Sequence, residues 1–322
     1  MKLEVKLKPQ FVYKLRAIKR DAEGNEISRR ESAELPNVFT NWGVESLFGA
    51  NSDTVSTIAG IVGTGNTTPA ITQTSMAAFK AGRYTPTSTG VGLIGRTWND
   101  LGSNQGYVQM QWRTIFGVGV ATGNISEVGA AFQQSNPTSL TNICSRALVV
   151  DGVGNPTTFE VLADEELQLD QFFRVYVDYS DRVTVMNVNG VDYTVTLRPM
   201  GLGAPNTHWP VFGAFSGPSA FSSVYYGTMT LATATSGSTP SATGGQDNLA
   251  QGSQGGANAY VPGTKQRSVY MRSPTGTARQ IGGFDIQQTA QGGWQCKFTP
   301  PIPKSNLERF TATLMYVIDN TP

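Results

Sequence analysis

Residue types on which enzymes and metal sites often depend are scarce in this chain. Its 322 residues include two cysteines, Cys144 and Cys296, and one histidine. Two cysteines are too few for a disulfide framework in a chain of this length, and their separation lacks the CxxC spacing of a zinc site. We therefore predict that both cysteines are small, buried hydrophobic residues, and infer that the chain folds in a reducing cytoplasm.

Candidate catalytic residues are correspondingly few. His208, the one histidine, lies between a polar loop and a Trp-Pro pair. A triad or zinc site around it is an alternative, but a histidine in such a loop is more often structural. The acidic run Asp164, Glu165 and Glu166 is the second candidate, because paired carboxylates can hydrolyse glycosides. On a strand its outer members would lie about 6.5–7 Å apart, yet such a run is more often a solvated turn. The sequence therefore favours a protein that is not an enzyme and needs no cofactor or metal.

Charge is also low. Charged residues make up 15% of the chain, against roughly 25% in an ordinary soluble domain. The 24 basic and 23 acidic residues give a net charge of +1, so no overall field attracts nucleic acid or an anionic membrane. The sequence lacks an apolar run of the roughly 18 residues that would suggest a membrane span, and its first ten residues alternate charged with apolar side chains, unlike a signal peptide. We expect no nucleic-acid partner and no membrane insertion.

Period-two alternation of apolar and polar residues is the dominant pattern in the sequence. It is clearest at 2–8, 108–113 and 191–197. Further β-rich runs, each bounded by Gly, Pro, Asn or Ser, occupy 172–177, 224–232, 268–272 and 311–318. Many short strands with such punctuation predict an all-β fold, an antiparallel β-sandwich or jelly-roll-like fold with very little helix.

Two short segments are the best helix candidates: WGVESLF, which follows Asn41, and SMAAF at 75–79. Residues 233–260 are of low complexity and carry few apolar side chains, which predicts a mobile surface loop. We expect an N-terminal β lobe over 1–200 and a C-terminal β lobe over 201–322 that contains this loop, unless the two pack as one domain.

A glycine-rich stretch, VGTGNTTPAITQTSMAAF at 62–79, raises the question of a phosphate-binding loop. A Walker loop needs Lys followed by Ser or Thr at its end, where a helix begins, so that backbone N–H groups face the phosphate. Neither is present. Gly65 and Asn66 tolerate the left-handed backbone of a turn, and Pro69 prevents continued ladder pairing. We therefore predict a strand end followed by a loop.

Basic residues are concentrated near the N-terminus. The simpler interpretation is a solvated strand face or an edge protected by lysines; the alternative is a docking surface for an acidic partner. The candidate docking residues are Lys6, Lys8, Lys14 and Arg16. Aromatic side chains could also stack on a sugar, although aromatic residues of β proteins lie in the core more often. The candidate glycan contacts are Trp209, Tyr225, Tyr226 and Trp294.

Five segments, in this order along the chain, resemble a family of tailed-bacteriophage virion proteins known as tail fibre or tail structural proteins. They are NVFTNWGVESL at 37–47, VGTGNTTPAITQTSM at 62–76, GNISEVGAAF at 123–132, SRALVVDGVGNPTTFEVLADEELQL at 145–169 and GGWQCKFTPPIPKSNLERFTATLMYV at 292–317. Each segment is a weak signal alone. Their shared order makes the resemblance more specific, although little of it extends over residues 198–290.

The resemblance implies a structural role without chemistry. The expected function is that of a tail component, in a fibre, tip or baseplate, acting in assembly and host attachment. Head or neck decoration and a carbohydrate-binding module are the alternatives. The implied partners are other copies of the chain, other virion proteins and a host surface glycan, and the implied location is the virion after folding in the host cytoplasm. Low charge together with many amide and hydroxyl side chains suits lasting subunit contacts.

Overall fold

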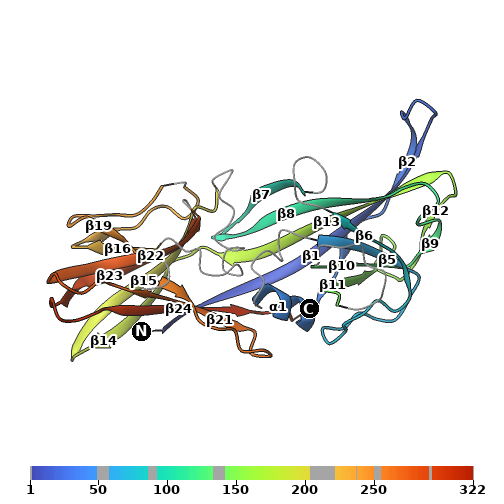
Figure 1. Ribbon diagram of the computed structural model, residues 1–322. Helices are drawn as coiled ribbons and strands as arrows, with labels where there is room; N and C mark the ends of the chain where they lie inside the picture. The colour runs from blue at the N-terminus through green and yellow to red at the C-terminus, as the bar shows by residue number, and fades with distance from the viewer. Residues whose placement is uncertain are drawn as a thin grey trace. The chain divides into compact units, whose positions relative to one another are not determined.

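Strands dominate the fold. The computed structural model describes residues 2–48, 58–85, 93–132, 142–203, 222–236, 238–249, 255–289 and 292–321. Within these ranges there is one helix, α1 (Asn41–Phe48), among antiparallel strand pairs (Figure 1), which confirms the predicted all-β class with very little helix. The same described ranges contain no helix that meets the length and hydropathy needed to cross a membrane.

The chain divides into two compact units. The first unit comprises Met1–Leu7, Arg96–Val108 and Tyr176–Val317; the second comprises Lys8–Gly95, Gln109–Val175 and Ile318–Pro322. Five strands contribute residues to both: β1 (Lys2–Arg20), β7 (Leu93–Gly102), β8 (Gln105–Phe116), β13 (Glu165–Asp178) and β24 (Thr311–Ile318). Because these strands carry the chain from one unit to the other several times, the units differ from the lobes expected over 1–200 and 201–322.

A six-stranded sheet belongs to the first unit, in the order β14-β15-β23-β22-β16-β19. Its strands are β14 (Arg182–Val188), β15 (Val191–Met200), β16 (Ser222–Tyr226), β19 (Gln246–Leu249), β22 (Arg279–Thr289) and β23 (Gly292–Lys304), and a separate pair is formed by β17 (Met229–Thr230) and β18 (Ser241–Ala242). The alternation predicted at 191–197 is present, since Tyr193, Val195 and Leu197 are buried. Val191 departs from it, with 49% of its surface exposed, because it directly follows the hairpin turn.

A second sheet has the strand order β20-β21-β24-β1-β13-β8-β7, with β2 and β3 also paired to β1. Its remaining strands are β2 (Glu26–Glu31), β3 (Leu35–Pro36), β7 (Leu93–Gly102), β20 (Gly255–Ala257), β21 (Gln266–Arg272) and β24 (Thr311–Ile318). In β8 the predicted alternation is confirmed, because Val108, Met110 and Trp112 are buried while Gln109 and Gln111 are partly exposed.

A five-stranded sheet in the order β4-β11-β10-β5-β6 lies in the second unit. Its strands are β4 (Val38–Phe39), β5 (Ile58–Gly63), β6 (Phe79–Thr85), β10 (Glu127–Ala131) and β11 (Ser145–Leu148), and β9 (Gly123–Ile125) pairs separately with β12 (Phe159–Val161). Aromatic rings fill the core of this unit. Phe11 packs on Phe173 with ring centroids 4.8 Å apart and on Phe39 at 6.1 Å, distances typical of favourable aromatic pairs.

The two helix predictions have opposite outcomes. Helix α1 begins at Asn41, where Thr40 caps it by accepting a 3.0 Å hydrogen bond from the N–H of Gly43. The helix predicted at 75–79 is wrong, since this segment is non-helical, bends at Ala77 and Ala78 and leads into β6. The N–H groups of these two alanines donate to a carboxylate distant in the sequence, and this tertiary interaction holds the bend.

The low-complexity segment 233–260 contains regular structure where it is described, so the prediction of a loop throughout is wrong. It supplies β18, β19 and β20. For example, β19 pairs with β16, where Asp247 lies opposite Val224. Strands β19 and β20 end their sheets, and β18 forms a separate pair. Backbone hydrogen bonds to a single neighbour hold such strands, and Gln246 and Asn248 of β19 stay exposed, so few apolar residues are needed.

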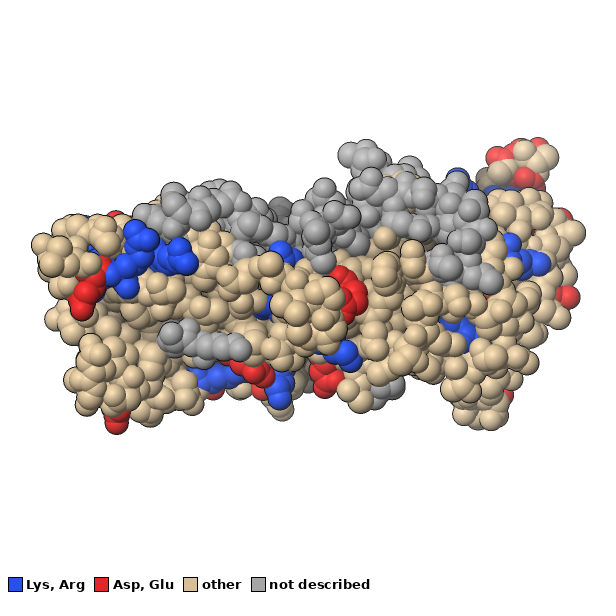
Figure 2. Space-filling model, turned by 60° about the horizontal axis from the view of Figure 1, so that its bottom comes forward, with Lys and Arg blue, Asp and Glu red and all other residues tan. Residues whose placement is uncertain are grey.

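The low content of charged residues is visible on the surface, because Lys, Arg, Asp and Glu cover a small part of the face shown in Figure 2.

Candidate functional site

The glycine loop, residues 62–78, is bound to a buried carboxylate of the chain itself. The N–H of Gly65 donates to Glu127 Oε1 at 3.1 Å, the N–H of Ala78 donates to the same oxygen at 2.6 Å, and the N–H of Ala77 donates to Oε2 at 3.1 Å. Glu127 is fully buried. The backbone amides that could bind a phosphate are thus already hydrogen-bonded to the carboxylate of Glu127. The loop follows the end of β5, as the sequence predicts, and is not an open phosphate site.

A buried arginine completes this arrangement. Arg146 Nε donates to Glu127 Oε2 at 2.5 Å, both side chains are 0% exposed, and Arg146 Nη1 donates to Gln73 Oε1 at 3.1 Å. Burying two charges is costly unless hydrogen bonds surround them, and here the loop amides supply those bonds. A Cβ at Gly65 would come within 2.6 Å of Glu127 Oε1, so the close approach requires glycine.

Two of the four predicted docking residues are engaged within the second unit. Lys14 and Arg16 both form ion pairs with Glu31, and Arg16 also pairs with Asp170, whose side chain is 0% exposed. The hydrogen bond from Lys14, more than any other group, holds the pKa of Glu31 below its usual range. These two basic residues therefore stabilise the pairing of β1 with β2 and offer little free charge to a partner.

Lys6 and Lys8 differ from this pair. Lys6 belongs to the first unit and Lys8 to the second, and both are exposed. Neither forms an ion pair with a residue in the described ranges. Of the four docking candidates, these two retain charge that a partner could meet, whereas Lys14 and Arg16 hold the fold together.

Each carboxylate of the acidic run at 164–166 also forms an ion pair. Asp164 pairs with Lys19 at 2.6 Å and Glu166 with Arg20 at 3.0 Å, while Glu165, 3% exposed, pairs with Arg30. The expectation of a wholly solvated turn is wrong for Glu165, because the hairpin of β1 and β2 supplies it with a cation. Each carboxylate of the run thus has its own basic partner in the second unit.

Three of the four candidate glycan contacts lie in the core of the first unit. Tyr225 is 0% exposed, Tyr226 4% and Trp294 1%. The Tyr225 hydroxyl donates to Asp285 Oδ2 at 2.8 Å, and the Tyr226 hydroxyl donates to Asp247 Oδ2 at 2.8 Å. Burial, followed by the interaction with Asp247, raises the pKa of Tyr226 to about 12. These rings have no exposed face on which a sugar could stack.

The remaining candidates have simple outcomes. Trp209 and His208 lie outside the described residues. Cys144 and Cys296 are buried free thiols, as predicted, and burial raises the pKa of both. In the described part of the chain, no group of three or more His, Cys, Asp or Glu side chains is placed to hold a metal ion.

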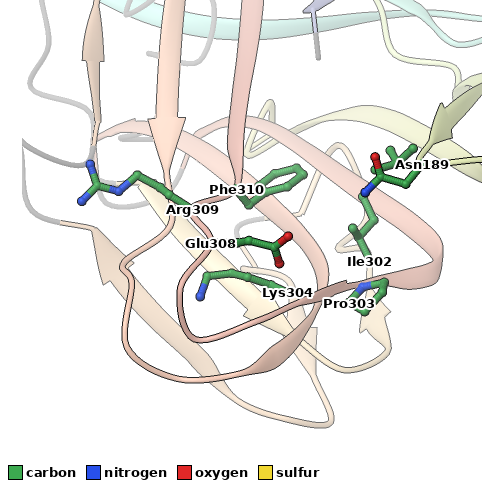
Figure 3. A pocket seen from close by; sticks show the side chains of 8 residues that line it. Asn189, Ile302, Pro303, Lys304, Glu308, Arg309 and Phe310 are labelled. Atoms are coloured by element: carbon green, nitrogen blue, oxygen red, sulfur yellow. The ribbon is translucent and has the colours of Figure 1, made fainter.

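A shallow pocket of about 180 Å³ lies in the first unit, beside the turn between β14 and β15 (Figure 3). It is smaller than the roughly 300–1,000 Å³ of typical small-molecule sites. Its lining residues are Val188, Asn189, Ile302, Pro303, Lys304, Glu308, Arg309 and Phe310. Lys304 Nζ donates to the carbonyls of Thr277 and Ser305, and Glu308 accepts from the N–H of Ser305. Lys304 and Glu308 thus hold the loop that lines the pocket.

No protein-family model, curated protein or solved structure matches the chain.

The buried ion pair of Glu127 with Arg146, together with Gln73, forms an anchor for the glycine loop that was not among the sites predicted from the sequence. A signal was present, because Glu127 and Arg146 are each a lone charged residue within an otherwise uncharged strand segment, in NISEVGAAF and SRALVV. A charge in such a position is seldom buried unless it is paired, so the two could have been predicted to meet.

Proposed function

We propose that the chain is a structural component of a tailed-bacteriophage virion, located in the tail as part of a fibre, tip or baseplate, and that it acts in assembly and host attachment. The observation that carries the proposal is the meeting in one unit of four of the segments on which the family resemblance depends. Gln73, Glu127 and Arg146 come from three of them and form the buried anchor.

The fourth segment joins the same unit through further polar contacts. Thr40 Oγ1 donates to the carbonyl of Ile143 at 2.8 Å, and the Thr40 N–H donates to the carbonyl of Cys144 at 3.0 Å. Asn37 and Tyr13 both donate to the hydroxyl of Ser145. The distinctive residues of the resemblance therefore hold loops and strands together. This use of polar side chains for contacts within the unit supports a scaffold role.

Exposed apolar residues in turns of the second unit also support a role in assembly. Val118 and Val120 are 62% and 56% exposed, and Val153 is 83% exposed. Apolar side chains at such turns can be covered by another protein in a particle. Low surface charge adds little electrostatic repulsion to these contacts.

Gold labelling of purified particles tests the proposal. Antibodies against the folded chain should decorate the tail in electron micrographs of the virus that encodes it, and the chain should co-purify with tails separated from heads. Label on the head or neck would replace the tail assignment with the decoration alternative. Absence of the chain from purified particles would overturn the virion role altogether. The carbohydrate-binding alternative is not carried forward, because it depended on four aromatic residues of which three are buried.

A further inference from the structure

Strand β14 forms an exposed edge of the six-stranded sheet. It ends the strand order and pairs with β15 alone among the described strands (Figure 1). Val183 and Val185, two residues apart and so on the same face, are 63% and 64% exposed. An edge strand presents a row of backbone N–H and C=O groups without a neighbour, which is a template for pairing with another strand.

The turn that joins β14 to β15 determines which backbone groups face outward. Asn189 and Gly190 have φ angles of 52° and 83°, which fit a two-residue hairpin turn. Val188 lies opposite Val191, and in such a turn these flanking residues are hydrogen-bonded to each other. Hydrogen-bonded and non-hydrogen-bonded pairs then alternate along the two strands.

Because the pairs alternate and Val188 is in a hydrogen-bonded one, the even-numbered residues of β14 direct their backbone N–H and C=O groups toward β15. Val183, Val185 and Asn187 lie opposite Thr196, Thr194 and Asp192 in the non-hydrogen-bonded pairs. Their N–H and C=O groups therefore point away from the sheet. In the described ranges β14 pairs with β15 alone, and no backbone hydrogen bond from a turn or loop reaches these three residues.

The other terminal strands of the described sheets are protected in ways that β14 is not. Charged side chains lie within β2, β6, β7 and β19, whereas β3, β4 and β20 have only two or three residues. Charge and short length are the usual protection against edge-to-edge pairing. After its first residue, Arg182, β14 has six uncharged residues without proline, VTVMNV, and its pairing with β15 has no bulge.

We propose that β14 pairs antiparallel with β14 of a second copy of this chain, with Val185 opposite its own counterpart. In this register Val183 lies opposite Asn187 of the other copy, and all three outward-facing residues find partners. About six hydrogen bonds then form across the pair. The two six-stranded sheets become one continuous sheet.

Charge and side-chain chemistry fit the same register. Arg182 lies opposite Val188 of the second copy, so like charges do not meet along the strand. The two Val185 side chains share a face and stand about 4.5–5.5 Å apart, a distance at which cross-strand β-branched pairs stabilise a sheet. A second copy is therefore a partner that matches this edge in both hydrogen bonding and charge.

Charge substitutions at Val185 test the proposal. Val185→Lys and Val185→Glu each place two like charges opposite one another, so each variant alone should associate about 30-fold or more weakly than the wild type. An equimolar mixture of the two variants should recover association, because Lys then faces Glu. Sedimentation equilibrium of the full chain measures the mass in each case, and circular dichroism establishes that each variant remains folded.

Val261→Lys and Val261→Glu are matched controls, since Val261 is 61% exposed and lies between β20 and β21, outside any described strand. They should associate as the wild type does. A wild-type protein that stays at 34.5 kDa up to its solubility limit would overturn the inference. So would Val185 variants that associate normally, or a mixture that fails to recover. None of these measurements depends on where the chain lies in a particle, so the virion role is tested separately.

Discussion

The two units bury polar groups in different ways. The second unit uses ion pairs: Glu127 with Arg146, Asp170 with Arg113 at 2.6 Å, and Glu165 with Arg30. The first unit relies more on hydrogen bonds with neutral groups. Asp285 accepts from the Tyr225 hydroxyl and the N–H of Ser223, while Gln295 bonds the N–H and carbonyl of Ala232 at 2.8 and 2.7 Å.

This difference implies different sensitivity to single substitutions. Removing one partner of a buried ion pair leaves a charge without compensation, at a cost of about 3–5 kcal/mol. Losing a neutral hydrogen bond costs about 1–3 kcal/mol when a buried group is left unsatisfied. The second unit should therefore be more easily disrupted by a single change than the first, and three experiments examine that contrast.

The largest effect is expected for Glu127→Ala, which should destabilise the second unit by about 3–5 kcal/mol. The change leaves Arg146 buried without its carboxylate and removes the acceptor for three loop amides. Hydrogen exchange should accelerate in peptides from β10 and the glycine loop. Glu166→Ala is the control, since its exposed partner makes the pair worth at most about 1 kcal/mol. Equal effects of the two substitutions would contradict a special role for the buried pair.

A smaller effect is expected in the first unit for Gln295→Leu. This change leaves the N–H and carbonyl of Ala232 without their partner and should cost about 1–3 kcal/mol. Because neither group titrates, the loss should be the same at pH 5 and pH 8 when measured by denaturant unfolding followed in first-unit peptides. A loss as large as that of Glu127→Ala would remove the contrast between the units.

The smallest effect concerns acid and the hairpin of β1 and β2. Hydrogen bonds from Lys14 and Lys19 are the main causes that lower the pKa values of Glu31 and Asp164. A carboxyl whose pKa is lower in the folded state contributes stability above its unfolded pKa, about 4 for these groups, and loses it as the pH falls through the folded pKa. Amide chemical shifts of β2 should therefore move toward unstructured values below about pH 4.

The strands β22 and β23 provide the internal comparison for that titration. They pair in the first unit with apolar side chains such as Phe284 and Cys296 opposite each other, so their amide shifts should change less over the same range. A simultaneous change in both regions would indicate global unfolding and would refute selective opening of the hairpin.

Local patterns in the sequence predicted the elements whose structure depends on local chemistry. Val108, Met110 and Trp112 alternate with polar neighbours and form a half-buried strand, and α1 begins beside its Thr40 cap. The segment 75–79 was predicted wrongly because its conformation depends on Glu127, which is remote in the sequence. Aromatic identity alone could not distinguish a sugar platform from a core residue, as the buried Trp294 illustrates.

The candidate site was less predictable than the fold. The basic residues near the N-terminus suggested a docking surface, but the acidic partners of Lys14 and Arg16 lie on β2 and β13. Only strand pairing brings these groups together. The turn at Asn189 and Gly190 likewise determines which residues of β14 direct their backbone N–H and C=O groups away from β15. The pattern of apolar residues does not specify this.

The anchoring of the glycine loop has a consequence for how its sequence can vary during evolution. Glu127 bonds to main-chain amides, which almost every residue type supplies, so these bonds do not specify side chains in the loop. The bond from Arg146 to Gln73 does specify one, at position 73. Apart from Gly65, where a Cβ does not fit, the tip is exposed at Thr64, Asn66 and Thr67. Related chains could therefore have different residues at these exposed loop positions. The loop would then contact different partners while the sheet that holds it stayed the same.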